Sequence, residues 1–266
     1  MFEIVGFIAA LFIGLSLGLM GGGGSIVTVP VLVYLLHYSP VVATGYSLFV
    51  VGSTSAVGAV MYKKRNLVDV KTAISFGVPA AIAVYLTRQF IVPAIPEEII
   101  SIGAFTVTKD IFLMLLFAVI MILAAVSMIK GQKSGSDAED DETQKAGFVI
   151  ILLQGSGIGL ITGLVGVGGG FMIVPALVVF SKLNMKLAVG TSLLIIAANS
   201  LIGFLGDVFT RSIDWYFLLI FTLISIVGIF IGNALSKKIP GAKLKAGFGW
   251  FVLAMGLYIF LKEIWL

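Results

Sequence analysis

The sequence predicts an all-α polytopic membrane protein made of two inverted repeats, each with about five helical segments. Hydrophobic residues make up 59% of the 266 residues and charged residues only 11%, whereas soluble domains carry about 25% charged residues. Several apolar runs, such as 111–129, contain no charge and approach the ~20 residues that span a bilayer. The second half of the chain also repeats the first, as shown below.

Ten apolar segments follow one another along the chain, in two sets of five. They cover 2–20, 25–37, 41–61, 71–91 and 110–130, and then 147–165, 170–182, 186–206, 214–236 and 244–262. The first carries an acid and no basic residue before its apolar run, and it lacks a small-residue cleavage site. We therefore expect a membrane segment there and not a cleaved signal peptide. Segments 25–37 and 170–182 are short for a span, which leaves eight full spans as the alternative.

A polar stretch, GQKSGSDAEDDETQK at 131–145, separates the two sets. It is acidic and has no aromatic residue, so it cannot bury enough apolar surface to order itself. The sequence thus predicts a first membrane repeat at 1–130, a cytoplasmic acidic linker at 131–146 and a second membrane repeat at 147–266.

The two membrane halves are copies of one another. A shift of 145 residues aligns 14–69 with 159–214 without a gap, and 18 of the 56 positions are identical. Internal repeats in a polytopic protein are typical of transporters, whose binding site lies at the repeat interface. The identical pairs include Pro30/Pro175, Gly45/Gly190, Ser47/Ser192, Ser55/Ser200 and Asp69/Asp214.

Five segments per repeat would invert the second repeat in the membrane, and the basic residues support this. If the loop 62–70 is cytoplasmic and every segment crosses, 13 lysines and arginines lie inside and 4 outside, namely Arg88, Lys109, Arg211 and Lys262. If the two short segments do not cross, 9 of these basic residues lie inside and 8 outside. Because cytoplasmic loops are enriched in basic residues, the charges favour ten crossings with both termini extracytoplasmic.

Glycine runs in both halves predict broken helices. Glycine costs about 1 kcal/mol and proline about 3 kcal/mol in a helix relative to alanine, and each run precedes a proline. A new helix after the break exposes N–H groups that, with the helix dipole, can bind an anion. The alternative is a tight turn without a ligand. The candidate anion-binding residues of the runs are Gly21, Gly22, Gly23, Gly24 and Ser25, with Gly166, Gly168, Gly169 and Gly170.

A second repeated motif, ATGYSL at 43–48 and AVGTSL at 188–193, opens segments with polar faces. Hydroxyls and amides inside apolar helices usually bond to carbonyls or to neighbouring helices, and this reading fits Ser53, Thr54, Ser55 and Ser200. Next to the glycine breaks such groups can also donate to an oxyanion. We therefore add four residues to the candidate substrate site: Ser47, Thr191, Ser192 and Asn199.

Charged residues are expected only near segment ends, so the sequence predicts no intramembrane ion relay. Asp69 and Asp214 are interpreted as helix caps, and Gly155, Gly159 and Gly163 as a helix-packing stripe, like Gly14/Gly18 and Gly228/Gly232. The lack of cysteine excludes thiolate sites, and His37 is the only histidine. We expect no enzyme, no catalytic residue, no metal, no cofactor and no nucleic-acid partner.

Specific motifs of the chain resemble those of the sulfite exporter TauE/SafE family. They are GLVGVGGGFMIVPAL (163–177), AVGTSL (188–193) and Ile213-Asp214-Trp215, with GLMGGGGSIVTVPVL, ATGYSL and YKKRNLVD (62–69) as counterparts in the first half. Tyr46 replaces the usual threonine. The resemblance implies a multi-pass carrier of the prokaryotic cytoplasmic (inner) membrane that exports sulfite, an organosulfonate or another small sulfur-containing anion.

Three functions remain open at this point: a secondary anion transporter, an anion channel of the same architecture, and a membrane scaffold that transports nothing. The partners expected are a small inorganic or organosulfur anion and the lipid bilayer. A coupling ion, proton or sodium, and the oligomeric state are left open by the sequence.

Overall fold

Helices form nearly all of the structure, a computed structural model that describes residues 2–102, 105–130, 144–165, 170–179, 181, 183–208, 212–236 and 241–265. The first half contains α1 (Phe2–Met20), α2 (Gly23–Pro30), α3 (Pro40–Lys63), α4 (Val70–Leu86), α5 (Val92–Ala94) and α6 (Lys109–Lys130). The second half contains α7 (Gln144–Val165), α8 (Gly170–Val179), α9 (Met185–Val208), α10 (Trp215–Ser236) and α11 (Gly241–Trp265). The helices follow the ten predicted segments, and α7 begins three residues before the predicted 147.

Among the described residues, four helical stretches are long and apolar enough to cross a membrane. They are Pro40–Lys63, Val70–Ala94, Lys186–Val208 and Trp215–Ser236. Shorter apolar helices accompany them at Val5–Met20, Gly24–Leu35 and Leu153–Val165. This composition confirms the prediction of an all-α membrane protein at the level of its class.

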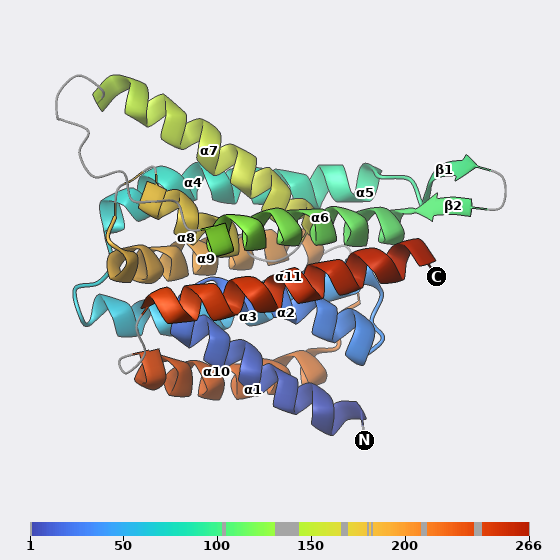
Figure 1. Cartoon of the computed structure of the whole chain (residues 1–266). Helices are drawn as coiled ribbons and strands as arrows, with labels where there is room; N and C mark the ends of the chain where they lie inside the picture. The colour runs from blue at the N-terminus through green and yellow to red at the C-terminus, as the bar shows by residue number, and fades with distance from the viewer. Residues whose placement is uncertain are drawn as a thin grey trace.

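Two local features depart from plain helices. Proline interrupts α2 at Pro30, and a wider π-helical turn, η1 (Val31–Leu35), continues it; a second such turn, η2 (Thr87–Ile91), follows α4. The strands β1 (Glu98–Ile102) and β2 (Phe105–Thr108) pair antiparallel and extend from one end of the bundle (Figure 1). This hairpin corrects the all-α fold class: 98–102 and 105–108, between two predicted segments, form strands, and their isoleucine, phenylalanine, threonine and valine residues favour that conformation.

Helices from opposite halves pack against each other in corresponding pairs. The first helix of each half lies along the fourth helix of the other, α1 along α10 and α7 along α4, and α6 packs along α11 (Figure 1). Between them α3 and α9 run antiparallel, with Gly45 next to Asp207 and Gly58 next to Leu193. The N-terminal end of α1 and the C-terminal end of α11 lie at the same end of the bundle.

Glycines allow these helices to approach closely, as the sequence predicts. A Cβ atom on Gly14 would overlap the Ser225 carbonyl of α10, and one on Gly159 would overlap the Ala80 carbonyl of α4. The other predicted packing glycines also face backbone or side chains of the neighbouring helix; they are Gly18, Gly155, Gly163, Gly228 and Gly232. Small residues at such contacts let helix backbones pack without intervening side chains.

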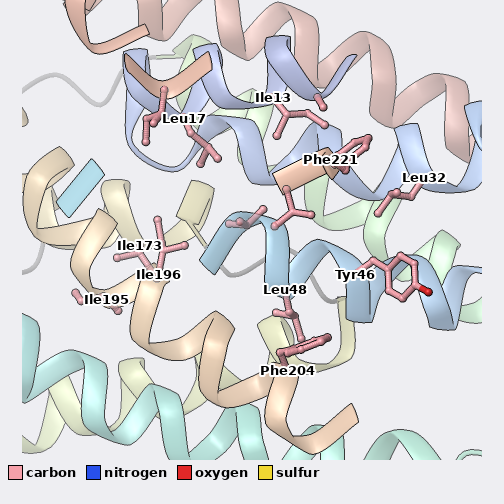
Figure 2. Close-up of a cluster of buried hydrophobic side chains, with 14 of the residues drawn as sticks. Ile13, Leu17, Leu32, Tyr46, Leu48, Ile173, Ile195, Ile196, Phe204 and Phe221 are labelled. Atoms are coloured by element: carbon pink, nitrogen blue, oxygen red, sulfur yellow. The ribbon is translucent and has the colours of Figure 1, made fainter. Parts of the chain in front are cut away.

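The apolar core fills the space between the two halves. Ile13 of α1, Ile173 of α8, Phe204 of α9 and Phe221 of α10 belong to one buried cluster. Figure 2 shows that Leu48 of α3 points toward Phe204, so the core joins the two central helices. A second cluster lies between α2, α6 and α11. Polar groups within this interior are therefore shielded from water.

The predicted helix caps are confirmed. The Asp69 carboxylate accepts a hydrogen bond from Thr72 N at 3.2 Å, and the Asp214 carboxylate accepts one from Phe217 N at 3.1 Å. A carboxylate in this position satisfies an N–H group that the first helical turn leaves without a partner. The two caps thus define where α4 and α10 begin.

Candidate functional site

The first glycine run breaks the helix where the sequence predicts. Gly21 has φ of +74°, a left-handed conformation that glycine adopts without steric cost. Its N–H still donates to Leu17 O at 2.8 Å, whereas Gly22 N turns to Met20 O at 2.9 Å, and α2 starts at Gly23. In the second half α7 ends at Val165. The predicted site residues Gly166, Gly168 and Gly169 lie outside the described residues.

The starts of α2 and α8 meet each other at buried positions. A Cβ atom on Gly170 would lie 2.6 Å from Gly22 Cα and 2.6 Å from Ile196 Cδ1 of α9. A Cβ on Gly21 would lie 3.0 Å from Ser192 Oγ. Gly24 faces α1 instead, because a Cβ there would lie 2.6 Å from Leu17 Cγ. The predicted residues Gly21, Gly22, Gly170 and Ser192 are therefore brought together.

Three hydroxyls of the predicted site already have partners. Ser25 Oγ donates to Gly22 O at 2.7 Å, and Ser192 Oγ donates to Val189 O at 2.8 Å. Thr191 Oγ1 accepts from Asp69 N at 2.9 Å. Ser25 and Ser192 stay near the glycine break, whereas Thr191 ties the start of α9 to the loop before α4.

A second group of polar side chains, carried by α3 and α9, is fully buried. We call it the polar stripe, and it consists of Ser47, Thr54, Ser55, Asn199 and Ser200. The hydroxyls and both amide atoms of Asn199 have no hydrogen-bond partner among the described residues. An unsatisfied buried polar group costs about 1–3 kcal/mol, and native proteins contain few of them. The stripe therefore presents donors and acceptors that no described residue satisfies.

Ser200 of the polar stripe shares the face of α9 that reaches the glycine breaks. Ser192, Ile196 and Ser200 are spaced four residues apart, which places them on one face of α9. Ser192 lies beside Gly21 and Ile196 beside Gly170. The sequence predicts Ser47 and Asn199 in the site, whereas Thr54, Ser55 and Ser200 resemble ordinary polar faces of membrane helices. These three residues join the candidate site because they are completely buried without a hydrogen-bond partner among the described residues. Such burial can be seen only in the folded chain.

A buried ion pair joins two charged residues that lie near the ends of predicted segments. Arg88 Nη2 lies 3.0 Å from Asp207 Oδ2, and the side chains are 0% and 4% exposed. Arg88 Nη1 also donates to Thr44 Oγ1 at 3.1 Å. Arg88 was expected in an outer loop because it lies near the end of an apolar segment. The helix instead continues through η2, and Gly206 of α9 packs on the arginine side chain, so the guanidinium is enclosed.

A pocket reaches this ion pair from the end of α9. Its empty volume, including open solvent, is about 230 Å³, and its lining residues are Val42, Gly45, Tyr46, Phe204, Asp207, Ser212 and Ile213. Ser212, one of these lining residues, is exposed. A Cβ on Gly45 would lie 2.9 Å from Asp207 Oδ2, so glycine is needed for this approach. Among the described residues no His, Asp or Glu side chains gather in a group of three that could hold a metal ion.

Known proteins with related sequences agree on transport across membranes. The family model described as "Sulfite exporter TauE/SafE" matches residues 6–259. A "Probable membrane transporter protein" of Xylella fastidiosa (strain 9a5c) is 29% identical over 93% of this chain and 90% of its own length. A protein of the same description from Bacillus subtilis (strain 168) is 27% identical over 87% of this chain and 89% of its own.

A third relative, from Methanocaldococcus jannaschii, is also described as a probable membrane transporter and is 32% identical over 41% of this chain and 43% of its own. No solved structure matches the chain significantly. The family and these relatives mark a multi-pass membrane transporter rather than an enzyme. The chain thus belongs to the sulfite exporter TauE/SafE family of membrane transporters.

Proposed function

We propose that this protein is a secondary transporter that exports a small sulfur-containing oxyanion, such as sulfite or an organosulfonate, across the cytoplasmic membrane. The anion binds between the two halves, at the glycine breaks and the polar stripe. The observation that carries this proposal is the polar stripe itself, whose hydroxyls and amide are buried without a hydrogen-bond partner in the part of the chain that the structure describes. Ser200 of the stripe shares the face of α9 that reaches the glycine breaks through Ser192 and Ile196. The family description supports the choice of a sulfur oxyanion.

The chemistry of these groups suits an oxyanion. Hydroxyls, an amide NH₂ and backbone N–H groups donate hydrogen bonds without carrying a charge. The N-terminal ends of α2 and α8, near Gly22 and Gly170, add the positive ends of two helix dipoles. Transporters commonly bind anionic groups at the positive ends of discontinuous helices near the membrane midplane. The site would also include Gly166, Gly168 and Gly169, the equivalents of Gly21, Gly23 and Gly24.

We further infer that the halves are inverted repeats with ten crossings. Contacts that recur after the 145-residue shift support this inference. Gly14 faces Ser225 as Gly159 faces Ala80, and Asp214 N bonds to Tyr46 Oη as Asp69 N bonds to Thr191 Oγ1. Such reciprocal pairs are expected when two copies of one unit pack about a pseudo-two-fold axis.

The proposed orientation places both termini and the β1–β2 hairpin outside the cell and the acidic linker in the cytoplasm. The bias of lysine and arginine toward the predicted cytoplasmic loops supports it. Rocking of one half against the other would then expose the central site to each side in turn. This motion distinguishes a carrier from a channel, in which the site is open to both sides at once.

Transport assays in proteoliposomes test the proposal. Sulfite, thiosulfate, sulfate and an organosulfonate are compared as substrates, and Thr54→Val is compared with Thr222→Val. Both threonines are buried, but the Thr222 hydroxyl bonds to Leu218 O at 2.6 Å. Thr54→Val should raise the KM for the transported anion about tenfold, the effect of losing about 1.4 kcal/mol of binding. Thr222→Val should transport normally.

Two results would contradict the proposal. If none of the four anions is transported, the substrate class is wrong. If Thr54→Val and Thr222→Val transport alike, the binding site lies elsewhere. Flux that never saturates with anion concentration would assign the same architecture to a channel.

A further inference from the structure

Asn199 makes the polar stripe differ between the two halves of the protein. The 145-residue shift pairs Ser55 with Ser200, but it pairs Thr54 with Asn199. Both Thr54 and Asn199 are fully buried. A hydroxyl rotates its single hydrogen toward whatever accepts it, whereas an amide carries a carbonyl oxygen that only accepts and an NH₂ group that only donates. The second half therefore adds a dedicated acceptor to the stripe, and the first half has none at this place.

Asn199 lies on the face of α9 that reaches the glycine breaks. It follows Ile196 by three residues and Ser192 by seven, and residues at these spacings share one face of a helix. A Cβ atom on Gly170 would lie 2.6 Å from Ile196 Cδ1, and one on Gly21 would lie 3.0 Å from Ser192 Oγ. The amide therefore belongs to the same surface of α9 as both contacts with the broken helices.

The Asn199 amide can bind a donor and an acceptor at once. Neither its Oδ1 nor its Nδ2 has a hydrogen-bond partner among the described residues, so this conclusion holds whichever way the amide is turned. An oxyanion without hydrogen offers acceptors only. It satisfies the NH₂ group and leaves the carbonyl oxygen buried without a partner, which costs free energy. A ligand that also carries an O–H or N–H group satisfies both atoms.

The positive charge available to the ligand matches one negative charge. The only charged residue of α3 is Lys63 in its last turn, and those of α9 are Lys186 in its first turn and Asp207, which is paired with Arg88. The N-terminal ends of α2 and α8 each contribute about half an elementary positive charge, or about one together. A second negative charge on the ligand would be buried without compensation, and burying an uncompensated charge is expensive. The arrangement therefore favours a monoanion over a dianion.

We propose that the central site selects a singly charged sulfur oxyanion that carries its own hydrogen-bond donor, and that Asn199 is the residue that recognises this donor; this rests on the proposed function. The amide Nδ2 donates to an oxygen of the anion, and Oδ1 accepts from its O–H or N–H group. Hydrogensulfite and sulfonates with a hydroxyl group belong to this class. Sulfate does not, because at neutral pH it carries two charges and no donor.

Binding of three anions of similar size and shape to the purified full-length protein tests the inference. Sulfamate carries one charge and an NH₂ group, methanesulfonate has a methyl group in place of the NH₂, and sulfate carries two charges and no donor. Wild-type protein should bind sulfamate about tenfold more tightly than methanesulfonate, the effect of one hydrogen bond to a buried acceptor. It should bind methanesulfonate at least about tenfold more tightly than sulfate, because only sulfate buries a second charge. Titration calorimetry at neutral pH measures the three dissociation constants.

Asn199→Leu keeps the approximate volume of the side chain and removes the amide. This variant should bind sulfamate and methanesulfonate alike and still discriminate against sulfate, because the charge preference does not depend on the amide. The matched control is Asn233→Leu. Asn233 is also buried, but its Oδ1 already accepts from Arg65 Nη1 at 3.1 Å. The control should keep the wild-type preference for sulfamate.

Several results would overturn this inference and leave the proposed function intact. They are equal wild-type affinities for sulfamate and methanesulfonate, an affinity for sulfate that equals or exceeds that for methanesulfonate, a sulfamate preference retained by Asn199→Leu, and binding of sulfite without binding of sulfamate. If neither sulfite nor any of the three probes binds, the proposed function fails and the inference with it. The wild-type comparison decides between these results even if Asn199→Leu does not fold.

Discussion

The backbone N–H of Asp214 donates a 2.7 Å hydrogen bond to the hydroxyl of Tyr46 and so joins the start of α10 to α3. The corresponding bond in the other half runs from Asp69 N to Thr191 Oγ1 at 2.9 Å. Tyr46 and Thr191 occupy equivalent positions of the repeated motif, and each anchors the loop before the fourth helix of the opposite half. Because both side chains carry a hydroxyl that accepts this hydrogen bond, Tyr46 can stand where the family motif has a threonine.

Removing the Tyr46 hydroxyl should weaken this junction. Tyr46→Phe keeps the ring that packs on Tyr38 and Phe217 but loses the acceptor for Asp214 N, so we expect a loss of about 1 kcal/mol in the free energy of unfolding. Unfolding in detergent micelles measures it. Tyr216→Phe is the matched control, since Tyr216 is 80% exposed. Equal effects of the two substitutions would rule out the anchoring role.

Glycine-mediated contact between α7 and α4 predicts opposite effects for two neighbouring glycines. A Cβ on Gly159 would overlap the Ala80 carbonyl, so Gly159→Ala should destabilise the protein by about 1–3 kcal/mol through overpacking. A Cβ on Gly157 meets nothing within 4 Å, and Gly157→Ala should stabilise α7 by up to about 1 kcal/mol. Thermal unfolding of both variants shows whether each substitution stabilises or destabilises the protein, and destabilisation by Gly157→Ala would contradict the open space around Gly157.

The buried pair should show strong coupling in a double-mutant cycle. Arg88→Met leaves the Asp207 carboxylate buried without its cation, which should cost about 3–5 kcal/mol. The double variant Arg88→Met with Asp207→Leu removes both charges and should be more stable than Arg88→Met alone. Chemical unfolding measures the free energy of unfolding of the wild type, Arg88→Met, Asp207→Leu and the double variant, which together make up the cycle. Additive single effects would mean that the two side chains do not interact.

Acid should weaken the cap that Asp69 places on α4. Burial alone would raise the pKa of Asp69, but hydrogen bonds from Thr72 and Lys71 and the Lys71 charge outweigh it and hold the pKa below its ordinary value. A group with a depressed pKa stabilises the folded state fully above its unfolded pKa, about 3.9 for aspartate. That stabilisation is lost as the pH falls through the folded pKa.

Asp69→Asn can still cap the helix but cannot titrate. Its free energy of unfolding should therefore fall less steeply than that of the wild type below about pH 4. Unfolding measured from neutral pH downward compares the two slopes. Parallel curves would show that the Asp69 carboxylate contributes nothing to stability in its ionised form.

Much of the fold can be predicted from local sequence patterns. The ten segments, the break at Gly21 and the caps at Asp69 and Asp214 each depend on a few neighbouring residues, so hydropathy, backbone preference and capping chemistry predict them. The packing role of Gly14 and Gly159 is also readable, because small residues at helical spacing have one common use between membrane helices. The β1–β2 hairpin was missed because a short β-branched stretch between apolar segments looks like an ordinary loop.

The ion pair and the polar stripe were decided by the tertiary structure. Arg88 and Asp207 each lie near the end of an apolar segment, where a charge normally reaches water, and nothing local indicates that η2 and α9 enclose both. Thr54 and Ser200 look like other hydroxyls of membrane helices in the sequence, but the fold buries both without a hydrogen-bond partner among the described residues. The sequence by itself determined the helices and their duplication through short-range preferences. Packing between distant segments decided which polar groups are buried away from water. Burial depends on neighbouring segments that come together only when the chain folds.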